Sequence, residues 1–408
     1  MMAGILFVRE LFQQRSKPAG FAAANSQRQQ SNGTYTLLAT LGNASGSGKN
    51  PIGQLCFGAD GALYGSANGA GGGNVGTLFR LTTNGNFKTI YTLSNGVTGG
   101  SPYGGMALGP DSLLYGTLQY GGSNSGQGTI FRLSQAGTNY VLTNLVVFNG
   151  TNGASPQGTL LNGGDGFMYG TTFAGGTNGN GTIFRINTNG VFNTMATFML
   201  TNGLQPYGGL VRGPDGAFYG GGYGNSSNSR RIYRVTTNGS LTSLFAFPGN
   251  YGTTQYGSLV VGADGYLYDA LSDGGTVNGG LLFRVTTNGV AGIVSSFTAA
   301  VGIQPFAAPI FGLDGNLYGT TYSYGAGGGG TVYRFVFDHV TSITRSGTNA
   351  FVTATGTTSG NYGLFASTNL SSGVWTNLGN VLATNSLVHF TDPNAGQFPR
   401  RFYRTAAQ

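Results

Sequence analysis

The sequence predicts an all-β protein: a six-bladed β-propeller closed by an N-terminal strand and followed by a small β-sandwich-like module. Three observations predict this fold. One pattern recurs six times with a period of about 50 residues, which is typical of propellers and solenoids. Each copy holds four short runs of alternating apolar residues, separated by tight turns. A run that matches the last strand of a copy stands by itself before the first copy.

The six copies align on one tyrosine. In successive copies it is Tyr64, Tyr115, Tyr169, Tyr219, Tyr268 and Tyr318. In the first copy, IGQLCFG, ALYGSA, TLFRL and NFKTIYTL have the pattern of strands, and ADG and TTNG have the pattern of turns. Asp-Gly and Asn-Gly favour β-hairpins because these residues tolerate a positive φ. Four antiparallel strands per copy describe a propeller blade, whereas a parallel β-helix, the second choice, has a shorter coil without hairpins.

The two ends of the array predict how the ring closes. The sixth copy stops at GTVYRFVF, residues 330–337, without a fourth strand, and TYTLLATL at 34–41 matches the fourth strands of other copies. Pairing this segment into the sixth blade removes the sheet edges of an open array. We therefore expect a propeller at 33–338, after a disordered polar segment at 1–32. The alternating runs at 339–408 predict the sandwich-like module.

Composition excludes several classes of protein. Charged residues are 7% of the chain, against about 25% in ordinary domains, and the net charge of +8 is scattered, so we expect no nucleic-acid partner. The chain has no run of about 18 apolar residues, which predicts no transmembrane segment. The apolar run in MMAGILFVRE is too short for a signal peptide, so an export signal is not evident. The single cysteine, Cys56, stands at an apolar strand position and is expected in the core.

The catalytic inventory of the propeller region is small. It contains no His and no Glu, which excludes a His-based triad and nearly excludes a zinc site. Outside the turn aspartates described next, its carboxylates are Asp269 and Asp273. We therefore predict no catalytic residue, no metal and no cofactor, although a lyase that uses Tyr and Arg stays open.

Every copy carries one aspartate in its first turn and one arginine at the end of its third strand. The aspartates are Asp60, Asp111, Asp165, Asp215, Asp264 and Asp314, and the arginines are Arg80, Arg132, Arg185, Arg234, Arg284 and Arg334. Residues that occur in every copy most simply serve the architecture. We expect six contacts that fix the turns, with six anion sites as the alternative.

Long loops gather on the face opposite the tight turns, and loops on a rigid scaffold are where binding tends to occur. These loops carry four aromatic residues at equivalent places, Tyr103, Tyr207, Tyr256 and Phe306. Flat rings beside Asn, Ser, Thr and Gly suit carbohydrate or peptide surfaces. The alternative is that the four rings pack one blade against the next.

Two neighbouring copies depart from the repeat. Copy four has Arg230 and Arg231 where other copies have Gly-Thr, and copy five has Asp269 in place of a glycine and Asp273 in its loop. We predict that an arginine of this pair lies within ion-pair reach of an aspartate at one rim. The pair then serves either as a ligand site or as an ion pair across the seam, which contributes little if exposed.

The repeats GALYGSANGAGGGNVGTLFRLT and GNLYGTTYSYGAGGGGTVYRF resemble the GloVer tandem repeat of bacterial extracellular proteins, over roughly residues 34–337. The end, DPNAGQFPRRFYR, resembles a C-terminal module of exported bacterial proteins. The resemblance implies a secreted or cell-surface protein and no known reaction.

These observations lead to three functional hypotheses. The first is a non-catalytic, monomeric surface propeller whose long-loop face binds glycan or a cell-surface protein. The second is a polysaccharide-degrading, lyase-like enzyme. The third is a purely structural surface repeat protein.

Overall fold

The computed structural model describes residues 38–39, 41, 48–51, 53–69, 75–94, 96–122, 126–224, 230–248, 258–312, 316–325, 329–335, 340–355, 361–368, 376–382, 387–398 and 401–407. The segment 1–32, expected to be disordered, and Tyr256 lie outside these residues. The chain divides into two compact units, one up to Leu313 with Tyr318–Tyr333, the other Asp314–Leu317 with Arg334–Gln408. The second division falls inside the strand Thr331–Phe335, a few residues before the expected boundary at 338.

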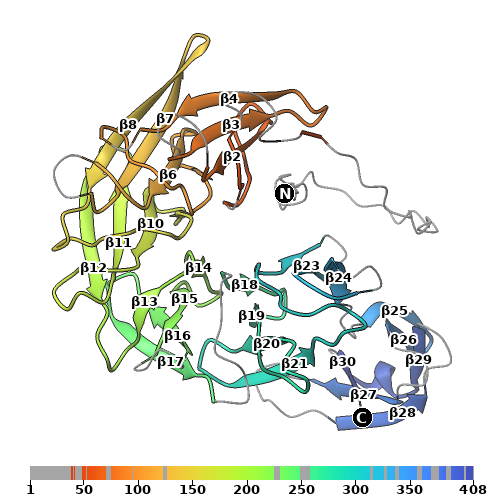
Figure 1. The fold of residues 1–408 in the computed structure, drawn as a ribbon. Helices are drawn as coiled ribbons and strands as arrows, with labels where there is room; N and C mark the ends of the chain where they lie inside the picture. Colours follow the sequence, from red (N-terminus) through yellow and green to blue (C-terminus); the bar gives the residue numbers. More distant parts are fainter. Residues whose placement is uncertain are drawn as a thin grey trace. The chain divides into compact units, whose positions relative to one another are not determined.

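Each of the six repeats forms one antiparallel sheet, and the sheets follow one another in chain order (Figure 1). Repeat 1 holds β1 (Cys56–Phe57), β2 (Leu63–Ala67), β3 (Thr77–Leu81) and β4 (Phe87–Thr92). Repeat 2 holds β5 (Ala107–Leu108), β6 (Leu114–Leu118), β7 (Thr129–Ala136) and β8 (Asn139–Val147). Repeat 3 holds β9 (Leu161–Asn162), β10 (Phe167–Thr172), β11 (Thr182–Asn187) and β12 (Phe192–Thr197).

The later repeats vary this plan. Repeat 4 holds β14 (Val211–Arg212), β15 (Phe218–Tyr223), β16 (Arg230–Val235) and β17 (Leu241–Ala246), and an added strand β13 (Leu204–Pro206) pairs with β15. Repeat 5 holds β18 (Val260–Val261), β19 (Leu267–Leu271), β20 (Leu281–Val285) and β21 (Ala291–Ser296). Repeat 6 holds β22 (Ile310–Phe311), β23 (Leu317–Thr321) and β24 (Thr331–Phe335), and the described residues give its sheet no fourth strand.

The tight turns form where the sequence predicts them. Between β3 and β4, the amide of Gly85 donates to the carbonyl of Thr82 at 2.9 Å, and Gly85 has a φ of 91°. The hydroxyl of Thr82 accepts the amide of Asn86 at 3.0 Å. A side chain that bonds the backbone within the turn, together with a glycine at positive φ, fixes the hairpin register.

The fourth strand of a repeat packs on the core of the next repeat. Leu145 and Val146 of β8 contact the core of repeat 3. The cluster that they pack against contains Leu160, Met168, Phe184 and Ile186 of repeat 3, together with Tyr115, Ile130 and Phe148 of repeat 2. Each sheet is therefore covered on one side by its neighbour, and this packing buries the apolar side chains of the strands.

The segment before the first repeat packs in the same way. Leu38, Ala39 and Leu41 contact the core of repeat 1. The contacted residues, Leu55, Leu63, Phe79 and Leu81, are equivalent to those that Leu145 and Val146 contact in repeat 3. The segment around Leu38 thus lies against repeat 1 where a preceding fourth strand would lie.

Neighbouring repeats also meet at a glycine and a proline. A Cβ on Gly76, before β3, would lie 2.8 Å from Cδ of Pro102, which precedes β5, so glycine alone permits this approach. The same glycine–proline contact joins Gly128 to Pro156, Gly181 to Pro206 and Gly280 to Pro305. Its recurrence explains why both residue types hold their places in the repeat.

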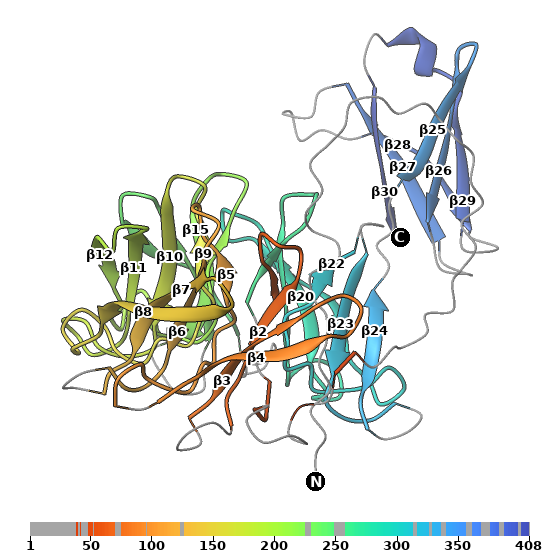
Figure 2. The same ribbon diagram turned by 90° about the horizontal axis from the view of Figure 1, so that it is seen from above.

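The second unit contains two three-stranded antiparallel sheets with a common apolar core (Figure 2). One sheet is β25 (Val340–Ser346), β26 (Asn349–Thr355) and β29 (Leu387–Asp392); the other is β28 (Thr376–Leu382), β27 (Asn361–Ser367) and β30 (Phe402–Ala407), with a 3-10 turn at Ala395–Gln397. Asp392 is its polar centre, paired with Arg401 at 2.6 Å and accepting the hydroxyl of Tyr403 at 2.8 Å. Burial, then this carboxylate, raises the pKa of Tyr403 to about 12.

Candidate functional site

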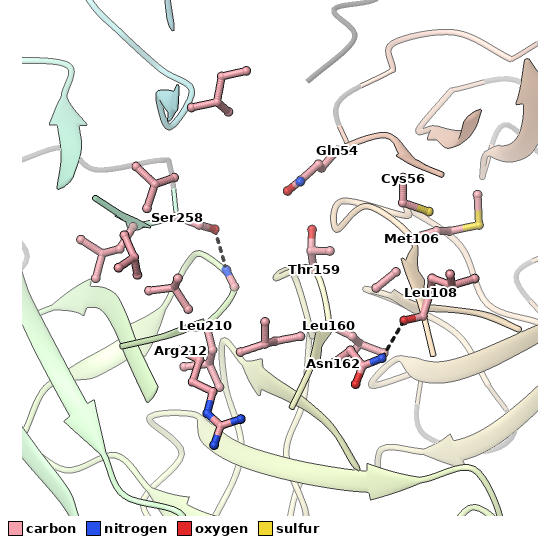
Figure 3. Close-up of a pocket in the computed structure, with 18 of the residues that line it drawn as sticks. Gln54, Cys56, Met106, Leu108, Thr159, Leu160, Asn162, Leu210, Arg212 and Ser258 are labelled. Carbon is pink, nitrogen blue, oxygen red and sulfur yellow. Dashed lines mark hydrogen bonds between the residues drawn. The ribbon is translucent and has the colours of Figure 1, made fainter. Parts of the chain in front are cut away.

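The first strands of all six repeats line one cavity of about 600 Å³ (Figure 3). Leucine, valine, isoleucine and phenylalanine side chains supply most of its wall. Gln54, Thr159 and Ser258 precede the first strands, and Asn162 and Arg212 end them, so each end of the cavity has polar groups. The cavity therefore runs from the long-loop side to the tight-turn side.

Hydrogen bonds tie neighbouring repeats at the long-loop end of the cavity. The amide of Gly105 donates to Oγ1 of Thr159, and the amide of Gly209 donates to Oγ of Ser258, both at 3.0 Å. Arg212, at the other end, donates from Nη1 to the carbonyl of Gly163 at 2.7 Å. These bonds hold the wall in place and occupy part of its polar capacity.

The long loops expose aromatic rings to solvent. Of the predicted rings, Tyr103 is 42% and Phe306 38% exposed, and Tyr207 is half-buried. Phe306 meets Tyr322 edge to face, with ring centroids 5.2 Å apart. Among the described residues of the repeats, all the exposed large aromatic side chains lie in long-loop segments; they are Tyr103, Tyr120, Phe306, Tyr322 and Tyr324.

A second aromatic group continues to an arginine. Phe173 and Tyr207 have ring centroids 4.9 Å apart, Tyr207 and Tyr223 have theirs 5.0 Å apart, and the hydroxyl of Tyr223 donates to that of Tyr207 at 3.0 Å. The guanidinium of Arg230 lies 3.5 Å from the centroid of the Tyr223 ring. We call these four residues the Arg230 cluster. Burial raises the pKa of Tyr223, but the bond with Tyr207 and the Arg230 cation outweigh burial and lower it overall.

Sequence analysis had placed only Tyr207 and Arg230 of this cluster among the site residues. Register could have supplied Tyr223, because β15 and β16 form a hairpin in which Tyr223 pairs with Arg230. Phe173 belongs to repeat 3 and Tyr207 to repeat 4. The contact between them depends on how the loops of neighbouring repeats meet, and hairpin patterns do not determine this.

The predicted ion pair between Arg230 or Arg231 and one of the two aspartates does not form. Arg231 donates from Nη1 to the carbonyl of Thr201 at 3.3 Å and to Oγ of Ser243 at 3.0 Å. Asp269 is fully buried, and its Oδ1 accepts the amide of Ala270 at 2.8 Å. Within the described part of the chain, the ion pairs do not join either arginine to Asp269 or Asp273.

The reason is the strand register. Asp269 occupies the place of a strand glycine, such as Gly319, whose Cβ would point at the third-strand ring of its own sheet. Its side chain therefore points into the protein interior and not to the rim. Its charge acts on Tyr333 of repeat 6, whose pKa burial and this carboxylate raise. Asp273 is half-buried in the loop after β19.

The turn aspartates bond to the repeated tyrosine. In repeat 3, Oδ2 of Asp165 accepts the hydroxyl of Tyr169 at 2.6 Å, and Oδ1 accepts the amide of Phe167 at 3.2 Å. The same two bonds form in repeats 1, 2, 4 and 5. Arginine joins in repeats 1 and 4, as ion pairs Arg80–Asp60 at 2.7 Å and Arg234–Asp215 at 2.8 Å. Asp314 lies outside the described residues.

These two ion pairs predict a stability that depends on pH. Burial raises the pKa values of Asp60 and Asp215, but hydrogen bonds, first from Arg80 and Arg234, outweigh it and hold both below the usual 3.8. A lowered carboxyl pKa stabilises the fold above the unfolded value, and this contribution disappears as the pH falls through the folded value. The variant D60N/D215N should melt below the parent at pH 7, and the difference should shrink as the pH falls below 3.8.

Thermal melting followed by circular dichroism between pH 7 and pH 2 measures this difference. The variant R80Q/R234Q removes the cation of each ion pair, so it should lose the same pH-dependent contribution to stability. A gap between parent and D60N/D215N that stays constant down to pH 2 contradicts the ion-pair account.

In the ranges that the structure describes, no three His, Cys, Asp or Glu side chains gather closely enough to hold a metal ion. No helix among those residues is long and apolar enough to cross a membrane.

Comparison with solved structures finds distant similarity. A putative 6-phosphogluconolactonase from Bacteroides uniformis is 15% identical, with a TM-score of 0.45 over 86% of this chain and 91% of that one. PorZ, a surface component of the type-IX secretion system of Porphyromonas gingivalis, is 12% identical, with a TM-score of 0.46 over 86% of this chain and 50% of that one. AofleA from Arthrobotrys oligospora is 11% identical, with a TM-score of 0.41 over 84% and 91%.

No curated protein matches the sequence. The model of the Gloeobacter/Verrucomicrobia repeat matches residues 25–230 and 126–333, two overlapping stretches that agree with the tandem repeat read from the sequence. Because the two stretches span most of the chain, the protein belongs to the Gloeobacter/Verrucomicrobia repeat family.

Proposed function

We propose that the protein is a non-catalytic, secreted or cell-surface β-propeller that binds glycan through its long-loop face. The observation that carries this proposal is the placement of exposed aromatic side chains, which in the described repeats lie in the long loops. Exposed rings on a rigid scaffold cost little conformational entropy when they bind, and they offer flat apolar faces to sugar rings. Tyr103 and Phe306 are the predicted members, with Tyr322 beside Phe306.

The proposed scaffold is a six-bladed ring closed by the segment at 34–41. The place of Leu38 against repeat 1 supports closure, because a fourth strand lies there in the other repeats. The two sheets of the second unit form the proposed sandwich-like module.

We propose the absence of catalysis because of where the carboxylates lie and what they bond to. General acid–base work on a glycosidic bond needs two acids about 5–10 Å apart beside the substrate. In the repeats the turn carboxylates that the structure describes bond to tyrosine, and Asp269 is fully buried. Asp273, half-buried in a long loop, stays in the proposed binding face with Arg231.

A glycan array probed with the whole chain tests the proposal. We expect binding without release of product, and Y103A or Y322A should weaken it about tenfold, which corresponds to the loss of a ring contact of about 1.4 kcal/mol. V191A and V290A are matched controls, because both valines are exposed in tight turns between third and fourth strands. Product release contradicts the non-catalytic proposal, and an array without binding favours the structural alternative.

A further inference from the structure

Repeat 4 departs from the other repeats at the residue that begins its third strand. Where Arg230 stands, the others have Gly76, Gly128, Gly181, Gly280 and Gly330, with φ between 93° and 117°. Arg230 instead has a strand backbone and pairs with Tyr223. Four of those glycines contact the proline of the following repeat. Arginine cannot take part in such a contact, because a Cβ would lie within 3 Å of the proline ring.

The following repeat has changed to match. In repeat 5 the residue equivalent to Pro206 is Gln255, which itself lies outside the described residues. One seam of the array has therefore exchanged glycine for arginine on one side and proline for glutamine on the other. Random drift at an exposed loop does not require such a pair of changes, whereas the placement of a large side chain at this seam requires both.

Two nitrogens of the arginine at this seam have no acceptor among the described residues. The Arg230 side chain is 5% exposed, and its Nε and Nη1 make no hydrogen bond to the part of the chain that the structure describes. One face of the guanidinium is covered by the Tyr223 ring at 3.5 Å. Burying a cation is costly unless an anion or several acceptors accompany it. The described ion pairs give Arg230 no carboxylate, so an anion or further acceptors have to come from outside this part of the chain.

We propose that the Arg230 cluster binds the carboxylate of an acidic sugar, such as a uronic acid residue in a polysaccharide. This proposal rests on the proposed glycan-binding function and names its ligand class. Arg230 supplies the cation in a water-poor setting, where its attraction for a carboxylate is stronger than at an open surface. Phe173, whose ring centroid lies 4.9 Å from that of Tyr207, adds an aromatic edge beside the sugar.

Calorimetric titration of the whole chain with a hexamer of galacturonic acid, and with the same hexamer after carboxyl reduction, tests this assignment. The variant R230G restores the residue of the other repeats. The control variant K88T removes an exposed cation from β4, beside a tight turn and away from the long loops. R230G should weaken binding of the acidic hexamer about tenfold or more and leave the reduced hexamer unchanged. K88T should stay within about twofold of the parent.

Equal binding of the acidic hexamer by parent and R230G overturns the assignment. If R230G does not fold, R230Q, which keeps the length and removes the charge, gives the same comparison. Neutral glycans that bind the array while the acidic hexamer has no advantage would refute this inference and leave the proposed function standing. If poly-glutamate binds and R230G abolishes that binding while the hexamer does not bind, the cluster recognises acidic peptide and the sugar assignment is wrong.

Discussion

Deletion of residues 34–41 should lower the melting temperature of the repeat unit by roughly 10 °C, equivalent to about 4 kcal/mol. Leu38, Ala39 and Leu41 cover the core of repeat 1, and no other segment of the described chain takes that place. The backbone agrees with this reading. A Cβ on Gly85 would lie 3.0 Å from the carbonyl oxygen of Leu38. In later repeats the corresponding glycines, Gly239 and Gly289, meet the carbonyls of Met195 and Leu244, which belong to fourth strands.

Differential scanning calorimetry measures the effect, and two variants separate its causes. Deletion of 1–32 is the control, because this polar segment is expected to contribute no core, so the melting temperature should stay at the parental value. L38D keeps the backbone but places a charge on the core of repeat 1, and it should lose about as much stability as the deletion. A chain without 34–41 that melts like the parent contradicts closure of the ring by this segment.

Replacing Gly105 by alanine should cost about 3 kcal/mol. Gly105 lies where repeats 1 and 2 meet, and a Cβ there would overlap the carbonyl oxygen and lie 2.7 Å from the amide nitrogen of Gln54, which lines the cavity. Backbone atoms cannot turn aside as a flexible side chain can, so the seam itself has to open. Opening it also weakens the bond from the Gly105 amide to Thr159 on the other side.

Urea unfolding of G105A and of the matched control G292A measures this cost. Gly292, in β21, has open space where a Cβ would stand, so alanine there should be neutral or slightly stabilising. G105A should also change the cavity, which near-ultraviolet circular dichroism of the surrounding aromatic residues reports. Equal unfolding midpoints for the two variants would show that the first strands can separate at no cost.

The repeated features of the fold were predictable because local chemistry determines them. Asp-Gly and Asn-Gly specify hairpins, and alternation specifies strands, so the sheets of repeats 1 to 5 agree with the pattern read from the sequence. The turn aspartate was expected to meet arginine, and it does so in repeats 1 and 4. Its more regular partner is the repeated tyrosine, four residues later. A tyrosine in the strand that directly follows the turn reaches the carboxylate from a fixed position, whereas a long arginine can bond to other acceptors, as Arg132 does with the carbonyl of Thr188.

The singular features were harder to predict because they depend on the contact between repeats. Asp269 replaces a glycine, and its charge led us to expect it at the exposed rim. The strand register instead directs its side chain into the interior. The sequence shows that Arg230 departs from the repeat, but it does not show which residues Arg230 contacts. The contact with Tyr223 depends on the hairpin register, and the link from Tyr223 to Tyr207 depends on how the loops meet. A comparison of each glycine with the proline of the following repeat would have shown that one seam is built differently.

The glycine–proline contact also restricts the history of that seam. An ancestral repeat 4 with glycine at position 230 could not have gained arginine while proline stood opposite, since the new side chain would have overlapped the ring. Loss of the proline first leaves only a small gap, which a folded protein tolerates. If glycine and proline once stood at positions 230 and 255, this geometry requires that glutamine at 255 preceded arginine at 230. A reconstructed ancestor that carries both glutamine and glycine should fold, whereas one that carries both proline and arginine should not.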